Sequence, residues 1–305
     1  MKGKKLLIVG GTGFIGRNVA REAVNRGFQV SSISRNSCPS EKKLKGVKYI
    51  VVDVIDKVKL SRALNDKTFH YVINLCGYVN HENYFDGGDK VFKVHFDGTM
   101  NLVSCIDKSY LKSFVQIGSS DEYGDNVAPQ NESQRESPIS PYSFAKVAST
   151  HFLQMLYKTE SFPAVVLRPF LVYGPGQDNN RFIPQIIQGC INDGEFSVSD
   201  GGQLRDFCYI DDIVDVILLV LTNKRAHGEV MNIASGVPAS IKDVVLLIKS
   251  LVDSGKPQFG LVPYRDGENM TLYADISKIQ NILKWSPKYR FLDGINKTIS
   301  YYDSR

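Results

Sequence analysis

Three glycines near the start of the chain limit its fold more than any other feature. Gly10, Gly13 and Gly16 have the spacing GxxGxxG and directly follow the apolar run of residues 6–9. Apolar residues then recur at helical spacing as far as Gly27. A strand, a glycine turn and a helix in this order bind the pyrophosphate of a dinucleotide at the helix N-terminus; a purely structural turn is the alternative. The cofactor-binding residues predicted here are Gly10, Thr12, Gly13, Phe14, Ile15 and Gly16.

The first two thirds of the chain alternate short apolar runs with helical patterns, which predicts an α/β fold with a Rossmann-type doubly wound parallel sheet. After about residue 174 this alternation stops, although residues 210–221 form an apolar helical stretch that we expect to return to the sheet. The strands that we expect are residues 6–9, 29–34, 48–52, 71–75, 114–117 and 164–167.

The change of pattern predicts two lobes. We expect residues 1–174, together with about 208–235, to form the dinucleotide-binding domain. Residues of about 175–207 and 236–305 would then form a smaller, discontinuous α/β lobe that binds the substrate, with the site between the lobes.

Composition excludes several other classes of protein. The net charge of +5 is mild, and the basic cluster at residues 42–45 lacks interleaved aromatic residues, so a solvated loop is favoured over a nucleic-acid interface. No apolar run reaches the roughly 18 residues of a membrane helix. Five cysteines, an odd number without a CxxC pair, are typical of reduced core residues in a cytosolic protein, and no metal site is predicted.

The end of the second expected strand bears on the choice of cofactor. NAD-specific enzymes usually have an acidic residue about 20 residues beyond the glycine turn, whereas this chain has Ser34, Arg35 and Asn36. A guanidinium matches a 2′-phosphate, so we favour NADP(H) and keep NAD(H), and a solvated Arg35, as alternatives. Asp53 and Val54 follow the third strand, where the aspartate would contact the adenine or simply form a surface turn.

A tyrosine and a lysine with the spacing YxxxK are the candidate catalytic pair. Tyr142 and Lys146 would lie one turn apart on a helix that begins near Pro141. A phenol has a pKa of about 10, and a neighbouring ammonium favours the phenolate that acts as a general base during hydride transfer. Ser119 follows the strand of residues 114–117 and is predicted to bind the reacting oxygen. Read alone, the pair fits a surface helix equally well, and Ser119 an ordinary polar turn.

Taken together, these segments resemble the extended short-chain dehydrogenase/reductase family of sugar-nucleotide epimerases, dehydratases and ketoreductases. The resemblance implies that Ser120 and Asp121 contact the sugar, that Arg205 and Arg265 bind the nucleotide diphosphate, and that the protein is a homodimer formed through the helix of Tyr142 and its neighbour around residues 91–106. The matching segments are GxxGxxG at 10–16, Ser119 four residues before Tyr123-Gly124, PYxxxK at 141–146, LRxxxVYGPG at 167–176, RDFxYVxD at 205–212, RxGE at 265–268 and ADxSK at 274–278.

Some positions depart from that family's pattern. Residues 74–77 read Asn-Leu-Cys-Gly where the family often has His-Leu-Ala-Ala, and His95 stands where an asparagine is common. Dehydratases in the family often have Thr-Asp-Glu beginning at the position of Ser119. Here Ser120 replaces the usual acid, which disfavours dehydration, although Asp121 would still be available as a base.

These motifs are compatible with three enzymatic functions. The chain segments 34–36 and 119–124 resemble NADPH-consuming reductases of nucleotide-linked 4-keto-6-deoxyhexoses, which we favour slightly. The main alternative is a 4-epimerase with tightly bound NAD, and a 4,6-dehydratase is a further one. A Rossmann-type binding or redox-sensing protein without turnover is disfavoured because Tyr142 and Lys146 are both present. The nucleotide base and the sugar stay open.

Overall fold

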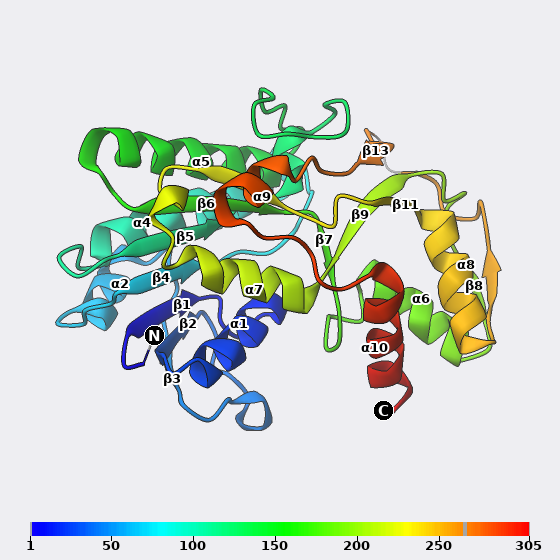
Figure 1. The fold of residues 1–305 in the computed structure, drawn as a ribbon, viewed down its shortest axis with the longest axis horizontal. Coiled ribbons are helices and arrows are strands. Elements are labelled where there is room, and N and C mark those ends of the chain that lie inside the picture. Colours follow the sequence, from blue (N-terminus) through cyan, green and yellow to red (C-terminus); the bar gives the residue numbers. More distant parts are fainter. Residues whose placement is uncertain (1, 265–266, 305) are drawn as a thin grey trace.

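A seven-stranded parallel sheet forms the larger part of the molecule in this computed structural model, which describes residues 2–264 and 267–304 (Figure 1). Its strands lie in the order β10-β6-β5-β4-β1-β2-β3, and every neighbouring pair is parallel. The strands are β1 (Lys5–Val9), β2 (Gln29–Ser34), β3 (Val47–Val51), β4 (Tyr71–Asn74), β5 (Ser113–Ile117), β6 (Ala164–Pro169) and β10 (Val230–Ile233).

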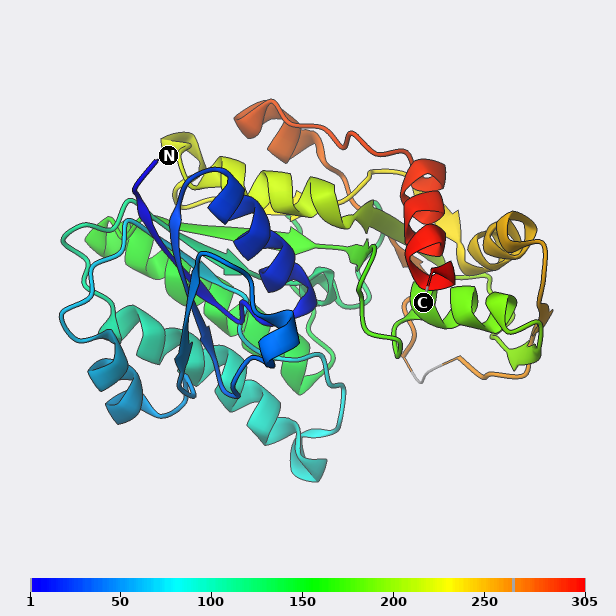
Figure 2. The same cartoon turned by 90° about the horizontal axis from the view of Figure 1, so that it is seen from below.

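Helices cover both faces of this sheet (Figure 2). Side chains alternate along β1, so Leu6 and Ile8 join one core and Leu7 and Val9 the other. The first core lies under α1 (Phe14–Asn25) and α7 (Ile210–Val220), and the second under α2 (Lys57–Leu64), α4 (Gly98–Cys105) and α5 (Pro141–Glu160). The short α3 (Gly88–Phe92) runs through a π-helical turn (Lys93–Asp97) into α4.

A smaller lobe is built around β9 (Leu204–Tyr209). Its remaining strands are β7 (Leu171–Tyr173), β11 (Pro238–Ser240) and β13 (Thr271–Leu272), with a separate pair of β8 (Glu195–Ser197) and β12 (Lys256–Gln258). The later helices are α6 (Phe182–Ile191), α8 (Ile241–Val252), α9 (Ser277–Leu283) and α10 (Phe291–Asp303). One-turn 3₁₀ helices occur at Ser40–Lys42, Tyr84–Asp86, Ser120–Tyr123 and Lys224–Ala226.

The predicted fold class is confirmed: a Rossmann-like parallel sheet carries a second, smaller lobe. All six expected strands form, each within two residues of its expected ends. The seventh, β10, was not singled out as a strand, but it lies within the stretch of about 208–235 that we assigned to the dinucleotide-binding domain. The exact lobe boundaries stay a prediction. No helix of the described residues has the length and apolarity needed to cross a membrane.

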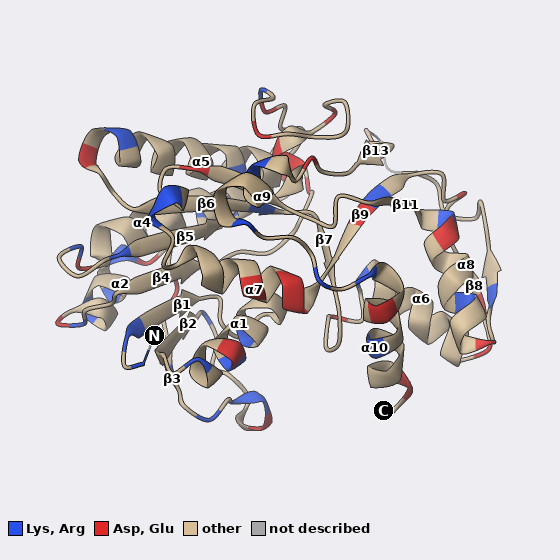
Figure 3. Ribbon diagram, in the orientation of Figure 1, with Lys and Arg blue, Asp and Glu red and all other residues tan. Residues whose placement is uncertain are grey.

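The sheet topology fixes where a ligand can bind. The strand order reverses at β1, which has β2 on one side and β4 on the other. Ligands of such sheets bind in the crevice at the carboxyl ends of the strands next to this reversal. Charged residues are scarce on the seven strands (Figure 3), where they are Lys5, Lys48 and the fully buried Arg168. A buried guanidinium needs a negatively charged partner to offset the cost of its burial, and that partner lies beside the site described next.

Candidate active site

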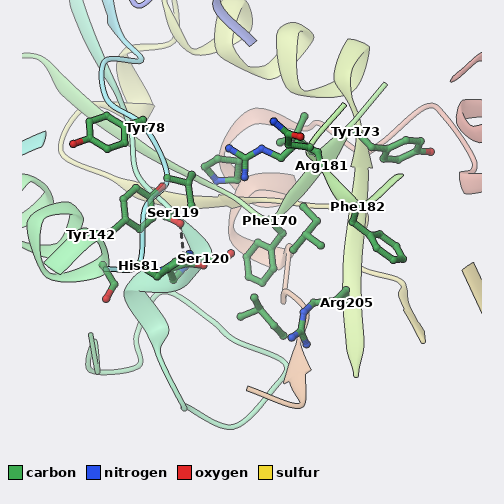
Figure 4. A pocket seen from close by; sticks show the side chains of 18 of the residues that line it. Tyr78, His81, Ser119, Ser120, Tyr142, Phe170, Tyr173, Arg181, Phe182 and Arg205 are labelled. Carbon is green, nitrogen blue, oxygen red and sulfur yellow. Dashed lines mark hydrogen bonds and ion pairs between the residues drawn. The ribbon is translucent and has the colours of Figure 1, made fainter. Parts of the chain in front are cut away.

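A cavity of about 1120 Å³ extends from the glycine turn to the smaller lobe. Its lining includes Gly10 and Gly13 of the glycine turn, the later Tyr142, and Arg181 and Arg205 of the smaller lobe. In Figure 4 the labelled Ser119, Tyr142 and His81 form one group and Phe182 and Arg205 lie apart from it, while the positive charge of Arg181 is close enough to lower the pKa of Tyr142. The cavity thus joins the expected cofactor end to the expected diphosphate end.

The glycine turn has the shape that a pyrophosphate needs. Gly10 has φ +82°, and a Cβ on Gly16 would lie 2.2 Å from the Gly10 carbonyl oxygen, so neither position accepts a larger residue without strain. At Gly13 a Cβ would meet only the Gly10 oxygen, at 3.4 Å, which leaves space on the cavity side. Gly13 caps α1 without a side-chain bond, so the first helical N–H groups stay available to an anion. Phe14 and Ile15 also line the cavity, whereas Thr12 does not.

The residues predicted to bind the adenosine lie at the carboxyl ends of β2 and β3, outside the lining of the main cavity. Ser34 donates its hydroxyl to the Asn36 carbonyl oxygen at 2.8 Å. Arg35 is exposed to solvent, and Val54 is buried. Asp53 accepts a hydrogen bond from the backbone two residues later, as a turn residue does. This edge adjoins the glycine turn, because β2 is the neighbour of β1.

The helix α5 places Tyr142 and Lys146 in the middle of the cavity. The Ser140 hydroxyl caps the helix by accepting from the Ser143 N–H at 3.1 Å, and Pro141 occupies the first turn, so the helix begins where the sequence predicted. Both side chains of the pair are more than nine-tenths buried. Lys146 Nζ donates to the Ile117 carbonyl oxygen, at the end of β5, at 2.7 Å. The lysine is therefore held against the strand that leads to Ser119.

Ser119 lies next to the Tyr142 phenol in the cavity lining. Its hydroxyl oxygen accepts from the Asp121 N–H at 3.1 Å and is hydrogen-bonded to the Tyr142 phenol. Burial raises the pKa of Tyr142, the charge of Asp121 raises it further, and the bond to Ser119 opposes both. Burial also lowers the pKa of Lys146. In the protein without ligand the phenol is therefore protonated, and a cationic nicotinamide nearby would favour its ionisation.

A buried ion pair fixes the backbone of Ser119. Glu122 Oε1 accepts from the Ser119 N–H at 2.9 Å, and Glu122 Oε2 accepts from Arg168 Nη2 at 2.7 Å and from Thr150 Oγ1 at 2.8 Å. Glu122 and Arg168 are both fully buried, and the charge pairing compensates much of the cost of burial. Sequence reasoning missed this support, because the two residues are 46 positions apart.

Asp121 and Ser120 line the cavity beside Ser119, as the resemblance implied for sugar-binding residues. Burial raises the pKa of Asp121, while the positive charges of His81 and Arg205 lower it. His81 Nε2 lies 3.8 Å from Asp121 Oδ2, and the His81 ring meets the Tyr142 ring edge-on with centroids 5.7 Å apart. His81 was not predicted, since it lies in the irregular loop after β4, and no motif marks it.

Two departures from the family's pattern form one contact behind Tyr142. His95 is buried in the π-helical turn, its Nε2 lies 3.0 Å from the Tyr78 carbonyl oxygen, and its ring centroid lies 5.0 Å from that of Tyr142. A Cβ on Gly77 would lie only 1.9 Å from His95 Cε1. Burial, together with the charge of Lys146, lowers the pKa of His95 to about 3, so the imidazole is neutral. Glycine at position 77 and histidine at position 95 are thus mutually dependent.

The far end of the cavity carries the groups expected to bind a diphosphate. Arg205 is mostly buried on β9 and forms an ion pair with Glu268. Arg265 lies outside the described residues. Arg181, which precedes α6, also lines the cavity and was not predicted. Phe182 stacks on Phe207 with ring centroids 6.0 Å apart; both line the cavity, and Phe207 belongs to the main core.

Known proteins of similar sequence and structure are enzymes that act on nucleotide sugars. Residues 6–234 match the model of the NAD dependent epimerase/dehydratase family. The dTDP-glucose 4,6-dehydratase of Xanthomonas campestris pv. campestris is 26% identical, over 97% of this chain and 92% of that protein. The UDP-glucose 4-epimerase of Thermotoga maritima, solved with UDP-glucose, has a TM-score of 0.91 at 25% identity and covers 98% of this chain and 99% of its own. The UDP-glucuronic acid 4-epimerase of Bacillus cereus, solved with UDP-glucuronic acid and NAD, has a TM-score of 0.87 at 27% identity, with the same coverage.

Proposed function

The chain belongs to the NAD-dependent epimerase/dehydratase family of enzymes that modify nucleotide sugars, and we propose that within this family it is a 4-epimerase of a nucleotide-linked hexose that keeps its NAD bound. The observation that carries the proposal is the cavity itself, with Ser119, Tyr142 and Lys146 between the glycine turn and Arg205. A sugar whose diphosphate lies at Arg205 would place its ring against the buried phenol.

The three residues of the middle of the cavity divide the proton transfer between them. Ser119 orients the sugar hydroxyl, and Tyr142 Oη takes its proton as the carbon is oxidised to the ketone. Lys146, at the end of β5, stabilises the phenolate by its positive charge. The bound nicotinamide supplies the hydride acceptor and donor. The 4-keto sugar then rotates so that its other face meets the nicotinamide. Hydride returns to that face, Tyr142 returns the proton to the oxygen, and the configuration at carbon 4 is inverted.

The relatives support the epimerase over the reductase that the sequence slightly favoured. The proteins named above are 4-epimerases and a 4,6-dehydratase, and one was solved with NAD. Ser120 supplies a hydroxyl where a dehydratase of the Thr-Asp-Glu type has an acid, which disfavours dehydration. The second candidate is a 4-keto-6-deoxyhexose reductase that uses NADPH. It is favoured by one observation, the exposed Arg35 at the end of β2, where a 2′-phosphate would lie.

The proposal includes a homodimer formed through α5 and the α3–α4 segment. Phe144 is 53% exposed on α5 and stacks on Phe92 with ring centroids 5.7 Å apart, and Phe96 continues this aromatic surface at 5.5 Å from Phe92. An exposed ring such as that of Phe144, in contact with the half-buried rings of Phe92 and Phe96, is typical of a surface that is buried on association. The interface would lie directly behind the helix that carries Tyr142.

One experiment separates the two candidates. The purified protein is denatured, and the released dinucleotide is identified by chromatography and mass spectrometry. The native protein is then mixed with UDP-, dTDP- and GDP-linked hexoses, and in parallel with NADPH and nucleotide-linked 4-keto-6-deoxyhexoses. Interconversion of C4 epimers without net change at the nicotinamide absorbance band supports the epimerase. Consumption of NADPH with a keto sugar selects the reductase, and absence of both reactions rejects the proposed site.

A further inference from the structure

The cavity contains a second pair of proton-transfer groups that a 4-epimerase does not need. His81 Nε2 lies 3.8 Å from Asp121 Oδ2, and both side chains line the cavity on the side of Tyr142. Figure 4 shows His81 beside Tyr142 and Ser120 and on the same side of the cavity as Ser119. Epimerisation at carbon 4 moves one hydride and one hydroxyl proton, and both return to the same sugar. No proton has to leave carbon, so the first acid–base group would suffice.

Asp121 is the carboxylate of the 119–122 segment that faces the ligand space. Its neighbour Glu122 is committed to the buried contacts with Arg168 and Thr150. Asp121, by contrast, lines the cavity with a side chain that is 31% exposed, and its Oδ2 lies 3.8 Å from His81 Nε2. The imidazole meets Asp121 through Nε2, so Nδ1 is the nitrogen left to accept a proton from a ligand.

The loop that carries His81 is held near its start by the π-helical turn and near its end by α5. Near its start, the Tyr78 carbonyl oxygen is bound by His95 Nε2. Near its end, a Cβ on Gly88 would lie 2.7 Å from both the Glu82 carbonyl oxygen and Pro141 Cγ, so the loop packs directly on the first residue of α5. Between these points the Glu82 N–H donates to the Asn80 side chain at 2.9 Å. His81 is therefore placed relative to Tyr142 by contacts, as a preorganised group should be.

We propose that His81, with Asp121 as its counter-charge, is a second acid–base group that removes a proton from the carbon next to the carbonyl carbon of a bound 4-keto nucleotide sugar. The edge-on contact of the His81 and Tyr142 rings supports this, because a carbonyl oxygen at the phenol has its flanking carbons only two bonds away. The inference rests on the proposed binding of a nucleotide sugar, and it adds carbon-acid exchange to the proposed epimerase.

The proposed step balances without an added oxidant or reductant. The C–H bond breaks, its proton goes to His81 Nδ1, and its electron pair forms the C=C bond of an enolate. The enolate oxygen accepts hydrogen bonds from the Tyr142 phenol, whose pKa is raised by burial, and from Ser119. Return of a proton from His81 to the same carbon restores the ketone. The positive charge that His81 acquires is compensated by Asp121.

Deuterium exchange tests the step directly. A nucleotide-linked 4-keto-6-deoxyhexose is incubated with the protein in D₂O, and incorporation at the carbons flanking the ketone is followed by NMR and mass spectrometry, with an enzyme-free sample as reference. Supplying the ketone makes the exchange independent of the oxidation step. The proposed function is followed separately, by interconversion of unoxidised nucleotide hexoses, so each can fail without the other.

Three variants isolate the pair. His81→Gln and Asp121→Asn should each slow the exchange by at least about a hundredfold, the lower scale of general-base catalysis, and the double variant should be little slower than either single one. His151→Gln is the matched control. His151 Nε2 lies 3.3 Å from Glu136 Oε2 in a similar pair, but it is not part of the cavity lining, so exchange should be unchanged. Thermal melts check that all variants are folded.

The outcomes decide the matter. Exchange that is lost in His81→Gln and Asp121→Asn but kept in His151→Gln supports the proposal. Exchange at the enzyme-free rate with the wild-type protein overturns it. Exchange that persists in His81→Gln overturns the role of His81, even if Asp121→Asn is inactive.

Discussion

The contact between Gly77 and His95 gives a prediction whose size follows from the structure. Replacing Gly77 by alanine has two costs. Gly77 has φ +115°, a backbone conformation that costs an L-residue about 1–3 kcal/mol. The new Cβ would also lie 1.9 Å from His95 Cε1, and forcing a side chain from a packed site costs about 1–3 kcal/mol. We therefore expect Gly77→Ala to lower the free energy of unfolding by about 2–6 kcal/mol.

A double-mutant cycle separates the two costs. His95→Asn removes the imidazole and, with it, the overlap, while the backbone strain at Gly77 remains. Gly77→Ala combined with His95→Asn should therefore be more stable than the sum of the single changes predicts, by about 1–3 kcal/mol. Urea unfolding of the wild type and the three variants measures this coupling, provided that the dependence on urea concentration is unchanged. Strictly additive costs would refute the reasoning, because they would mean that the ring and the Cβ do not compete for space.

The same cycle has a functional readout. The His95 ring lies edge-on to Tyr142 with centroids 5.0 Å apart, so a displaced imidazole would disturb the phenol. Turnover should fall in Gly77→Ala and recover in part in the double variant, whereas release of bound dinucleotide should change little. A loss of turnover that the double variant does not relieve would show that the backbone at Gly77, and not the ring, controls Tyr142.

Three further predictions address the proposed function. Tyr142→Phe should reduce turnover at least about a hundredfold while leaving binding of the dinucleotide nearly intact, as measured by steady-state rates and cofactor titration; near-normal turnover would reject the proton-transfer role. Arg35→Asp should weaken binding of NADP(H) selectively, and an unchanged preference between the two dinucleotides would show that this exposed arginine is a bystander. Phe144→Asp should convert a dimer to a monomer in analytical ultracentrifugation, because it places a charge on the aromatic surface with Phe92; a persisting dimer would place the interface elsewhere.

Local patterns were sufficient to predict the sheet. Continuous apolar runs mark strands that are buried on both faces, as residues 6–9 of β1 and 71–73 of β4 show. The four-residue strand β10 (Val230–Ile233), which includes Asn232, was not singled out because it lies beyond residue 174, where the regular alternation of strand and helix patterns stops. That asparagine is buried and accepts a hydrogen bond from the Tyr123 hydroxyl at 2.7 Å, a contact across 109 residues that no local pattern records.

In the candidate site, too, local patterns predicted some residues and missed those that depend on long-range contacts. Tyr142, Lys146 and Ser119 were predicted because helix periodicity and strand ends place them, and the structure brings them together. The groups that support them were missed. Glu122 and Arg168 fix the backbone of Ser119 only through an ion pair between β6 and the turn after β5, and its formation depends on the packing of the two elements.

The side chains that face Tyr142 across the cavity determine which reactions, besides oxidation and reduction, the protein can catalyse. Ser119, Tyr142 and Lys146 can serve any reaction that begins with removal of a hydride from a carbinol, so they do not choose between an epimerase, a dehydratase and a reductase. The choice depends on which groups reach the carbons next to the ketone. Here those groups come from the loop after β4 and from the 3₁₀ turn after β5, as His81 and Asp121. His81 comes from this loop and Tyr142 from α5, so a substitution of the His81 side chain would alter the second proton transfer while the Tyr142–Lys146 pair stays on its own helix. Exchange in D₂O therefore reports on the net reaction more directly than any variant of the shared trio.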